Sequence, residues 1–169
     1  MATNENLIKI FEYALNQEET GKSFFEVSMR RMGIGAAISA FKRLIKEEEK
    51  HILFINRIIE ELKAGNEIKP EEIKKVVLEP TNYFDARAKS EFLDQCLEGS
   101  MVPDVTVFNT AWLIEKDLSE FYANMAKHTE GKPKQAFVML SNWEKAHEKF
   151  FKGFRDKLTE VYSKMPWGG

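Results

Sequence analysis

Acidic and imidazole side chains recur at matching places in the two halves of this chain. Each half holds a glutamate and, 29 or 30 residues later, a Glu-x-x-His motif. The six residues are Glu18, Glu48, His51, Glu115, Glu144 and His147. The two motifs are 96 residues apart and the two earlier glutamates 97, so the chain contains an internal repeat. Carboxylate oxygens and imidazole nitrogens are suitable ligands for transition metals such as iron. One Glu-x-x-His motif arises often by chance, whereas two in register with two further glutamates indicate a metal site.

Helical periodicity places all four glutamates on faces that are otherwise apolar. Steps of three and four residues along 34–64 pass through large apolar side chains, with Glu48 as the one exception. The corresponding stripe along 133–162 is interrupted at its centre by Glu144 and His147. Each motif histidine lies one turn from its glutamate. The other two helical patterns each carry one glutamate at mid-stripe, so the six side chains are expected inside the protein.

A buried group of four glutamates needs something that neutralises its negative charge. Four buried carboxylates repel one another, and each costs several kcal/mol to desolvate. Without a cation, most of them would have to be protonated. No lysine or arginine occupies the four stripes near this level. Two divalent metals would balance the four charges, and one glutamate from each of two helices plus Glu-x-x-His from each of the other two is the recurrent di-metal arrangement. The alternative is that the histidines are core residues with satisfied hydrogen bonds and that the glutamates pair with distant arginines. It would require four coincidences at one level of the bundle.

Long helices must position these side chains. Helical patterns are expected over about 4–32, 34–64, 103–128 and 133–162. Short breaks at glycines pair these helices as two antiparallel hairpins. The connection at 66–102 is far longer than usual in a bundle, and it is expected to hold short helices after Pro70 and over 85–98. A long crossover lets the third long helix run parallel to the second. The fold class expected is therefore all-α, a ferritin-like four-helix bundle.

Composition further limits the domain organisation and the classes of partner that are expected. Its 169 residues, 43% of them hydrophobic, suit a single domain spanning 1–169. The near balance of 25 basic and 27 acidic residues argues against nucleic-acid or membrane-surface binding. A single cysteine, Cys96, excludes an internal disulfide or a CxxC module within this chain. No signal-like start and no long apolar run are present, so a cytoplasmic protein is expected.

At these residues the chain resembles the ferritin-like di-iron proteins, most closely their rubrerythrin-like branch. The matching features are Glu18, the EEKH run at 48–51, Glu115 with Tyr122 seven residues later, and the EKAH run at 144–147. The resemblance implies two iron ions, with manganese or a mixed pair as alternatives. It also implies metal bridging by Glu48 and Glu144, terminal carboxylates from Glu18 and Glu115, and terminal nitrogens from His51 and His147. Tyr122 would hydrogen-bond near the ligands, and its repeat counterpart is Phe25.

Two departures from the rubrerythrin-like pattern bear on activity. Rubrerythrins carry a C-terminal rubredoxin-like domain with CxxC pairs, and this chain has none, so electrons would come from a separate donor such as a rubredoxin-like protein. Rubrerythrins also place a further glutamate on the third long helix, three residues after the terminal ligand that corresponds to Glu115. Leu118 occupies that place here, which argues against the iron movement associated with their peroxidase cycle.

The resemblance implies a di-iron oxidoreductase that reduces hydrogen peroxide or dioxygen in oxidative-stress defence. Oxidation of an organic substrate is an alternative chemistry. A second alternative is iron oxidation and storage, which needs a cage of many subunits. A third is a structural bundle that holds metal without turnover, or holds none. The internal pseudo-two-fold symmetry is compatible with a homodimer.

Four other residues have a plainer explanation. His128 is interpreted as a surface histidine at a helix end. Trp112 and Trp143 are near ligand positions in sequence and are interpreted as packing or interface residues, with electron transfer as the alternative. Cys96 is interpreted as an inert buried thiol.

Overall fold

Helices make up the regular structure of the chain. The computed structural model describes residues 3–31, 36–77 and 104–164. Within them the helices are α1 (Asn4–Arg31), α2 (Ala36–Lys63), α3 (Pro70–Val77), α5 (Asp104–Lys127) and α6 (Gly131–Ser163), and no strand occurs in this described part. The prediction of an all-α protein with four long helices is therefore confirmed.

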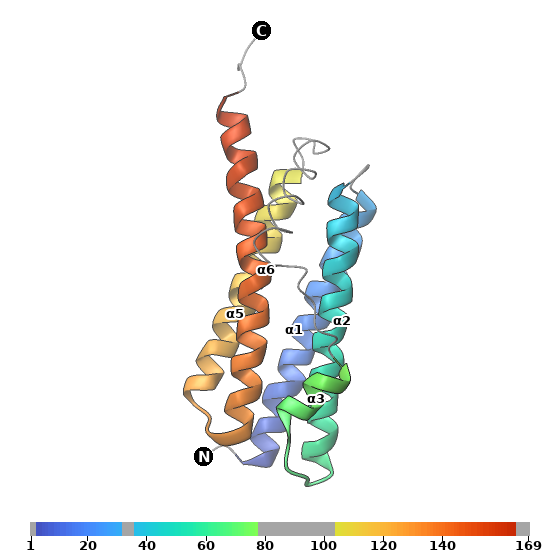
Figure 1. Ribbon diagram of the computed structural model, residues 1–169, viewed down its shortest axis with the longest axis vertical. Helices are drawn as coiled ribbons and strands as arrows, with labels where there is room; N and C mark the ends of the chain where they lie inside the picture. Colours follow the sequence, from blue (N-terminus) through green and yellow to red (C-terminus); the bar gives the residue numbers. More distant parts are fainter. Residues whose placement is uncertain (1–2, 32–35, 78–103, 165–169) are drawn as a thin grey trace.

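The long helices form two antiparallel hairpins that lie side by side (Figure 1). α1 packs on α2, and α5 packs on α6. α2 and α5 run in the same direction along the bundle, as the predicted ferritin-like topology requires. The predicted short helix after Pro70 is α3, which packs against both α2 and α6. The second predicted short helix, at 85–98, lies outside the described residues.

Local chemistry explains where two of the helices end or begin. Gly65 has a positive φ of 75° after the last turn of α2. Its N–H donates to the Leu62 carbonyl, and the Asn66 N–H donates to the Glu61 carbonyl, which satisfies two of the last free carbonyls of the helix. α6 begins at Gly131, two residues before the predicted start at Pro133. Proline fits inside the first turn because an N–H there has no partner within the helix.

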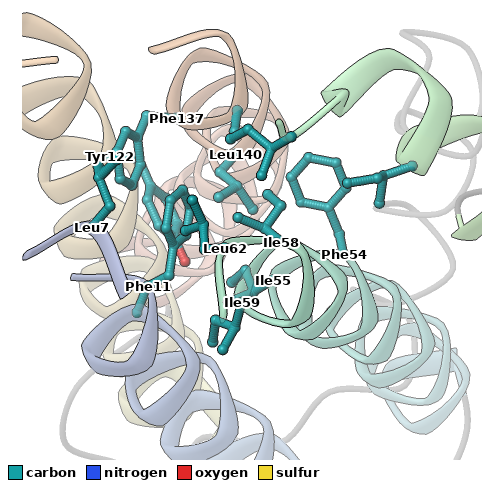
Figure 2. Packing of buried hydrophobic residues seen from close by; sticks show 14 of the residues in the cluster. Leu7, Phe11, Phe54, Ile55, Ile58, Ile59, Leu62, Tyr122, Phe137 and Leu140 are labelled. Carbon is teal, nitrogen blue, oxygen red and sulfur yellow. The ribbon is translucent and has the colours of Figure 1, made fainter. Parts of the chain in front are cut away.

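Two apolar clusters fill the bundle, one on each side of a polar layer. The first cluster contains Phe11, Phe54, Ile58, Phe137 and Leu140 among others (Figure 2). The second cluster contains Phe25, Phe41, Phe108, Phe151 and Phe154 among others. Along α1, Glu18 falls between the residues that belong to the two clusters. The buried polar layer is thus shielded from water along the bundle axis.

The first cluster joins the two hairpins through stacked rings, and truncating it should destabilise the fold. Phe11 of α1 stacks on Phe137 of α6 with ring centroids 4.6 Å apart and planes 5° apart. We expect Phe11→Ala to lower the free energy of unfolding by about 3–5 kcal/mol, because the buried ring leaves a cavity. Leu53→Ala is the control, since Leu53 is 56% exposed and should change stability by less than about 0.5 kcal/mol. Equal midpoints in urea for the two variants would contradict this account.

Candidate metal centre

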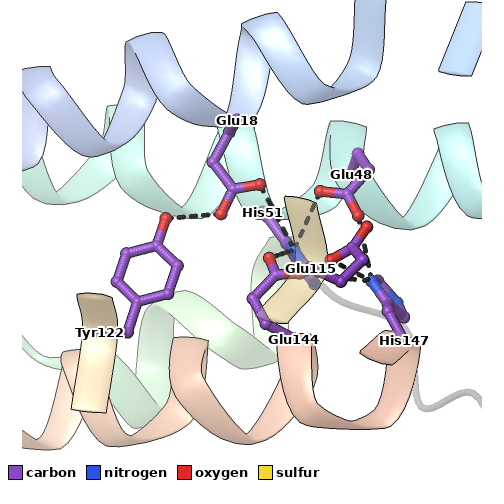
Figure 3. A network of polar contacts seen from close by, with 7 residues as sticks. All are labelled: Glu18, Glu48, His51, Glu115, Tyr122, Glu144 and His147. Carbon is purple, nitrogen blue, oxygen red and sulfur yellow. Dashed lines mark hydrogen bonds and ion pairs between the residues drawn. The ribbon is translucent and has the colours of Figure 1, made fainter. Parts of the chain in front are cut away.

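The six residues of the repeat meet at one level of the bundle (Figure 3). α1 contributes Glu18, α2 contributes Glu48 and His51, α5 contributes Glu115, and α6 contributes Glu144 and His147. Each of the six is at most 2% exposed. Mid-stripe placement on four separate helices has therefore brought four carboxyl groups and two imidazoles into one water-poor layer.

The two histidines reach across the bundle to the opposite hairpin. His51 Nδ1 lies 2.8 Å from Glu144 Oε1, and His147 Nδ1 lies 3.0 Å from Glu48 Oε1. The second oxygen of Glu48 is 3.5 Å from His51 Nδ1, and the second oxygen of Glu144 is 3.5 Å from His147 Nδ1. Each of these two central carboxylates therefore has one oxygen near each histidine. That arrangement suits groups that bridge two cations.

The remaining two glutamates lie on either side of this central pair. Glu18 Oε2 is 3.9 Å from His51 Nδ1, and Glu115 Oε2 is 3.6 Å from His147 Nδ1. We call Glu18 with His51 the first half-site, and Glu115 with His147 the second half-site. In the described part of the chain, the ion pairs of all four carboxylates are with the two histidines. Distant arginines do not provide the countercharge there.

Burial shapes the protonation of the outer carboxyl groups when metal is absent. Burial raises the pKa of Glu18 and that of Glu115 well above the usual range, and the negative charges of Glu144 and Glu48 raise both further. These two groups therefore hold protons where an exposed carboxyl would be ionised.

The central carboxylates and the histidines behave in the opposite way. Burial opposes ionisation of Glu48, but hydrogen bonds from His147 and His51 bring its pKa down to about 2. Burial likewise opposes ionisation of Glu144, and the charge of His51 lowers its pKa well below the usual value. Against the effect of burial, the charge of Glu144 raises the pKa of His51 well above its usual value. Burial also opposes the charged form of His147, but hydrogen bonds to Glu144 and Glu48 raise its pKa to about 9. Protons thus neutralise the metal-free layer, and metal ions would replace them.

Several buried carboxylate oxygens have no hydrogen-bond partner among the residues that the structure describes. They are Glu18 Oε2, Glu144 Oε2 and both side-chain oxygens of Glu115. Buried polar atoms normally have partners, and a cation would supply one for each of these oxygens. Ligand atoms of four residues, Glu48, His51, Glu144 and His147, all lie within 4.8 Å of one another. The donor set of carboxylate oxygen and imidazole nitrogen fits iron or manganese.

Comparison with known families agrees with this geometry. A family model described as Rubrerythrin matches residues 9–155, a span that includes all six residues. This chain belongs to the rubrerythrin family. Rubrerythrins are ferritin-like proteins that bind iron, and the buried glutamate and histidine group fits a di-iron carboxylate protein. Neither the curated proteins nor the solved structures contain a significant match to the chain.

Tyr122 adds a hydrogen bond to the first half-site of this rubrerythrin-family protein. Its buried hydroxyl donates to Glu18 Oε1 over 2.5 Å (Figure 3). The counterpart in the repeat, Phe25, is fully buried in the second cluster and has no hydroxyl. Leu118 is buried in the first cluster, at the place where the rubrerythrin-like pattern has a further glutamate.

Removing the Tyr122 hydroxyl should therefore weaken the fold around Glu18. We expect Tyr122→Phe to lower the free energy of unfolding by about 1–3 kcal/mol, because it leaves a buried carboxyl oxygen without its donor. Urea denaturation of the protein as purified measures this. Tyr13→Phe is the matched control, since Tyr13 is 53% exposed. Indistinguishable unfolding midpoints for both variants would show that the hydrogen bond adds no stability.

The two tryptophans near the site have different surroundings. Trp143 stacks on His51, with ring centroids 5.3 Å apart and planes 18° apart. Trp143 precedes Glu144 in the sequence, but its stacking partner, His51, lies on the other hairpin. No local sequence pattern predicts this contact. The guanidinium of Arg155 lies 4.0 Å from the centroid of the Trp112 ring, and the ammonium of Lys116 lies 5.5 Å from it.

The remaining sequence predictions concern the surface and the crossover. His128 is exposed at the end of α5, and its Nδ1 lies 2.8 Å from the carbonyl oxygen of Asn124. Cys96 lies outside the described residues. Among the helices that the structure describes, none is both long enough and apolar enough to cross a membrane.

Proposed function

We propose that this protein is a di-iron carboxylate oxidoreductase that reduces hydrogen peroxide or dioxygen, in defence against oxidative stress. The observation that carries the proposal is the buried layer of four carboxyl groups and two imidazoles, whose central carboxylates face both histidines. All six residues would act as metal ligands. When bound, the pair of iron ions would supply the electrons that such a reduction consumes.

The protein residues hold and shield the centre. Glu48 and Glu144 would bridge the two positions, and Glu18 and Glu115 would each complete one half-site. The two apolar clusters exclude water from above and below the layer, which strengthens every electrostatic interaction inside it. Tyr122 fixes the orientation of the Glu18 carboxyl group through its hydrogen bond.

Electrons must reach the centre from outside. Reduction of one hydrogen peroxide to two waters consumes two electrons and two protons. The chain has a single cysteine, so a redox partner of the small iron–sulfur class, such as a rubredoxin-like protein, would provide the electrons. Such a partner needs to bring only one electron at a time.

Anaerobic reconstitution tests this function. The apoprotein is loaded with Fe(II), mixed with a measured amount of hydrogen peroxide, and the remaining peroxide is determined. Consumption of about one peroxide for every two Fe(II) oxidised is expected, with catalytic turnover once a reduced rubredoxin-type donor is added. Loaded protein that consumes neither peroxide nor dioxygen would instead indicate a structural metal, as would a loss of folding stability on chelation without any turnover.

A further inference from the structure

Three aromatic rings form a continuous stack that leads into the buried metal layer. Trp143 of α6 lies on His51 of α2, with ring centroids 5.3 Å apart and planes 18° apart. His51 lies in turn on His147, with ring centroids 5.3 Å apart and planes 15° apart. The two imidazoles are the histidines of the candidate centre, one from each half-site. The indole therefore contacts one ligand side chain directly and is joined through it to the other.

The two ends of this stack differ in their exposure to solvent. His51 and His147 are each 2% exposed, whereas Trp143 is half-buried, so part of this residue reaches solvent. Phe54 holds the indole in place, because its ring meets Trp143 edge-on with centroids 5.0 Å apart and planes 81° apart. One end of the stack is thus accessible, and the other lies in the water-poor layer.

The buried ligands of the centre can receive an electron only through other side chains. All six are at most 2% exposed, and the two apolar clusters exclude water along the bundle axis. A donor protein at the surface must therefore pass its electron by tunnelling. Tunnelling slows steeply with distance and is favoured by stacked aromatic rings, because their π electrons are delocalised. The stack of Trp143 on His51 and His147 supplies such a path.

We propose that Trp143 is the residue through which electrons enter the di-metal centre, by way of its stacked partner His51. This inference rests on the proposed function. One electron leaves a reduced one-electron donor of the small iron–sulfur class and reduces one Fe(III) of the centre to Fe(II). Two such transfers replace the two electrons that the reduction of one hydrogen peroxide consumes. No bond of the indole forms or breaks, so Trp143 is unchanged after each transfer.

Stopped-flow kinetics with the iron-loaded protein tests this route. The oxidised protein is mixed anaerobically with a reduced rubredoxin-type donor, whose own absorbance records the electrons that it loses. We expect Trp143→Leu to slow this transfer at least about tenfold, and Trp143→Phe, which keeps a stacked ring, to restore most of the rate. Trp112→Leu is the matched control, since Trp112 is also half-buried but its ring faces the cations of Arg155 and Lys116. It should transfer electrons at the native rate.

Iron content and the oxidation of Fe(II) by peroxide separate electron transfer from a purely structural role. Both should stay unchanged in Trp143→Leu, because all six ligands remain. A native rate of electron transfer in this variant, or an equal loss of iron content and of oxidation by peroxide, would overturn the inference and leave the proposed function standing. Iron-loaded native protein that consumes neither peroxide nor dioxygen would overturn both.

Tryptophan fluorescence provides a second measurement that does not depend on turnover. Trp112→Phe/Trp167→Phe leaves Trp143 as the single tryptophan of the chain. Its emission should be quenched when the protein is loaded with iron and oxidised, because the excited indole can pass an electron to Fe(III) along the stack. Loading with Zn(II), which has no redox chemistry, should leave the emission in place. Equal emission from the iron-loaded and zinc-loaded forms would overturn the proposed path through this ring.

Discussion

Replacing Glu48 and Glu144 together by alanine is expected to abolish metal binding. The native chain, purified without a metal-binding tag, should contain about two iron or manganese ions, and the double variant essentially none. Each of these carboxylates has oxygens near both histidines, so losing the pair removes ligands from both half-sites at once. Elemental analysis measures the metal content directly, and circular dichroism shows whether the variant keeps its helices.

A matched control removes two carboxylates outside the buried layer, one on α2 and one on α5. Glu49 and Glu120 are exposed. Glu49 pairs with Lys22 at 3.2 Å, and Glu120 pairs with Lys116 at 3.8 Å, both on the surface. Surface pairs of this kind contribute at most about 1 kcal/mol. Glu49→Ala/Glu120→Ala should therefore keep its metal and its stability. Metal retained by the Glu48→Ala/Glu144→Ala protein, or absent from native protein even after anaerobic Fe(II) addition, would refute the di-metal interpretation.

Chelation is expected to destabilise the protein, and increasingly so as the pH rises. In the metal-free protein the pKa of His147 is raised from 6.5 to about 9. The stabilisation from this proton is fully present below pH 6.5 and is lost as the pH rises through about 9. The raised pKa values of Glu18 and Glu115 act in the same direction, because keeping these groups protonated becomes costly above the usual carboxyl range. In metal-loaded protein, the metal ions would neutralise the carboxylates in place of these protons.

The size of this effect makes it measurable in thermal melts. The shift of His147 alone corresponds to about 3 kcal/mol, or roughly 10 °C in melting temperature for a chain of this size. Melting temperatures of chelated and metal-loaded protein should therefore diverge between pH 6.5 and about 9. His147→Gln should flatten the pH dependence of the chelated form, whereas His128→Gln, at an exposed histidine, should not. Parallel melting curves for chelated and loaded protein across this range would contradict the charge assignment.

Acidification should act on different groups. The pKa of Glu48 is lowered from 4.5 to about 2, so its stabilising contribution is present above pH 4.5 and is lost as the pH falls through about 2. Glu144, whose pKa is also lowered, acts in the same sense. The chelated protein is therefore expected to be most stable in the mildly acidic range, between the limits set by its central carboxylates and by His147.

Helical periodicity made the candidate site predictable, because the period of a helix is local. Steps of three and four residues from Glu18 along α1 lead to Leu7, Phe11, Ala14 and Phe25, and all four are buried, as is Glu18. Along α2 the same steps from Glu48 lead to Ile52, which is only half-buried, and pass over Phe54 and Ile58, which fill the core. A strict alternation of three and four steps drifts from the true helical face over many turns.

The sequence by itself determined that four long helices would each carry a glutamate inward at one level, since spacing within a helix decides which face a residue occupies. The tertiary structure alone decided the partners. His51 meets Glu144, 93 residues away, and Tyr122 meets Glu18, 104 residues away. Trp143 lies on His51 for the same reason: contacts between hairpins depend on how the helices pack and turn against each other. Packing between the hairpins, and not the repeated motif, therefore decided which side chains contact the ligands.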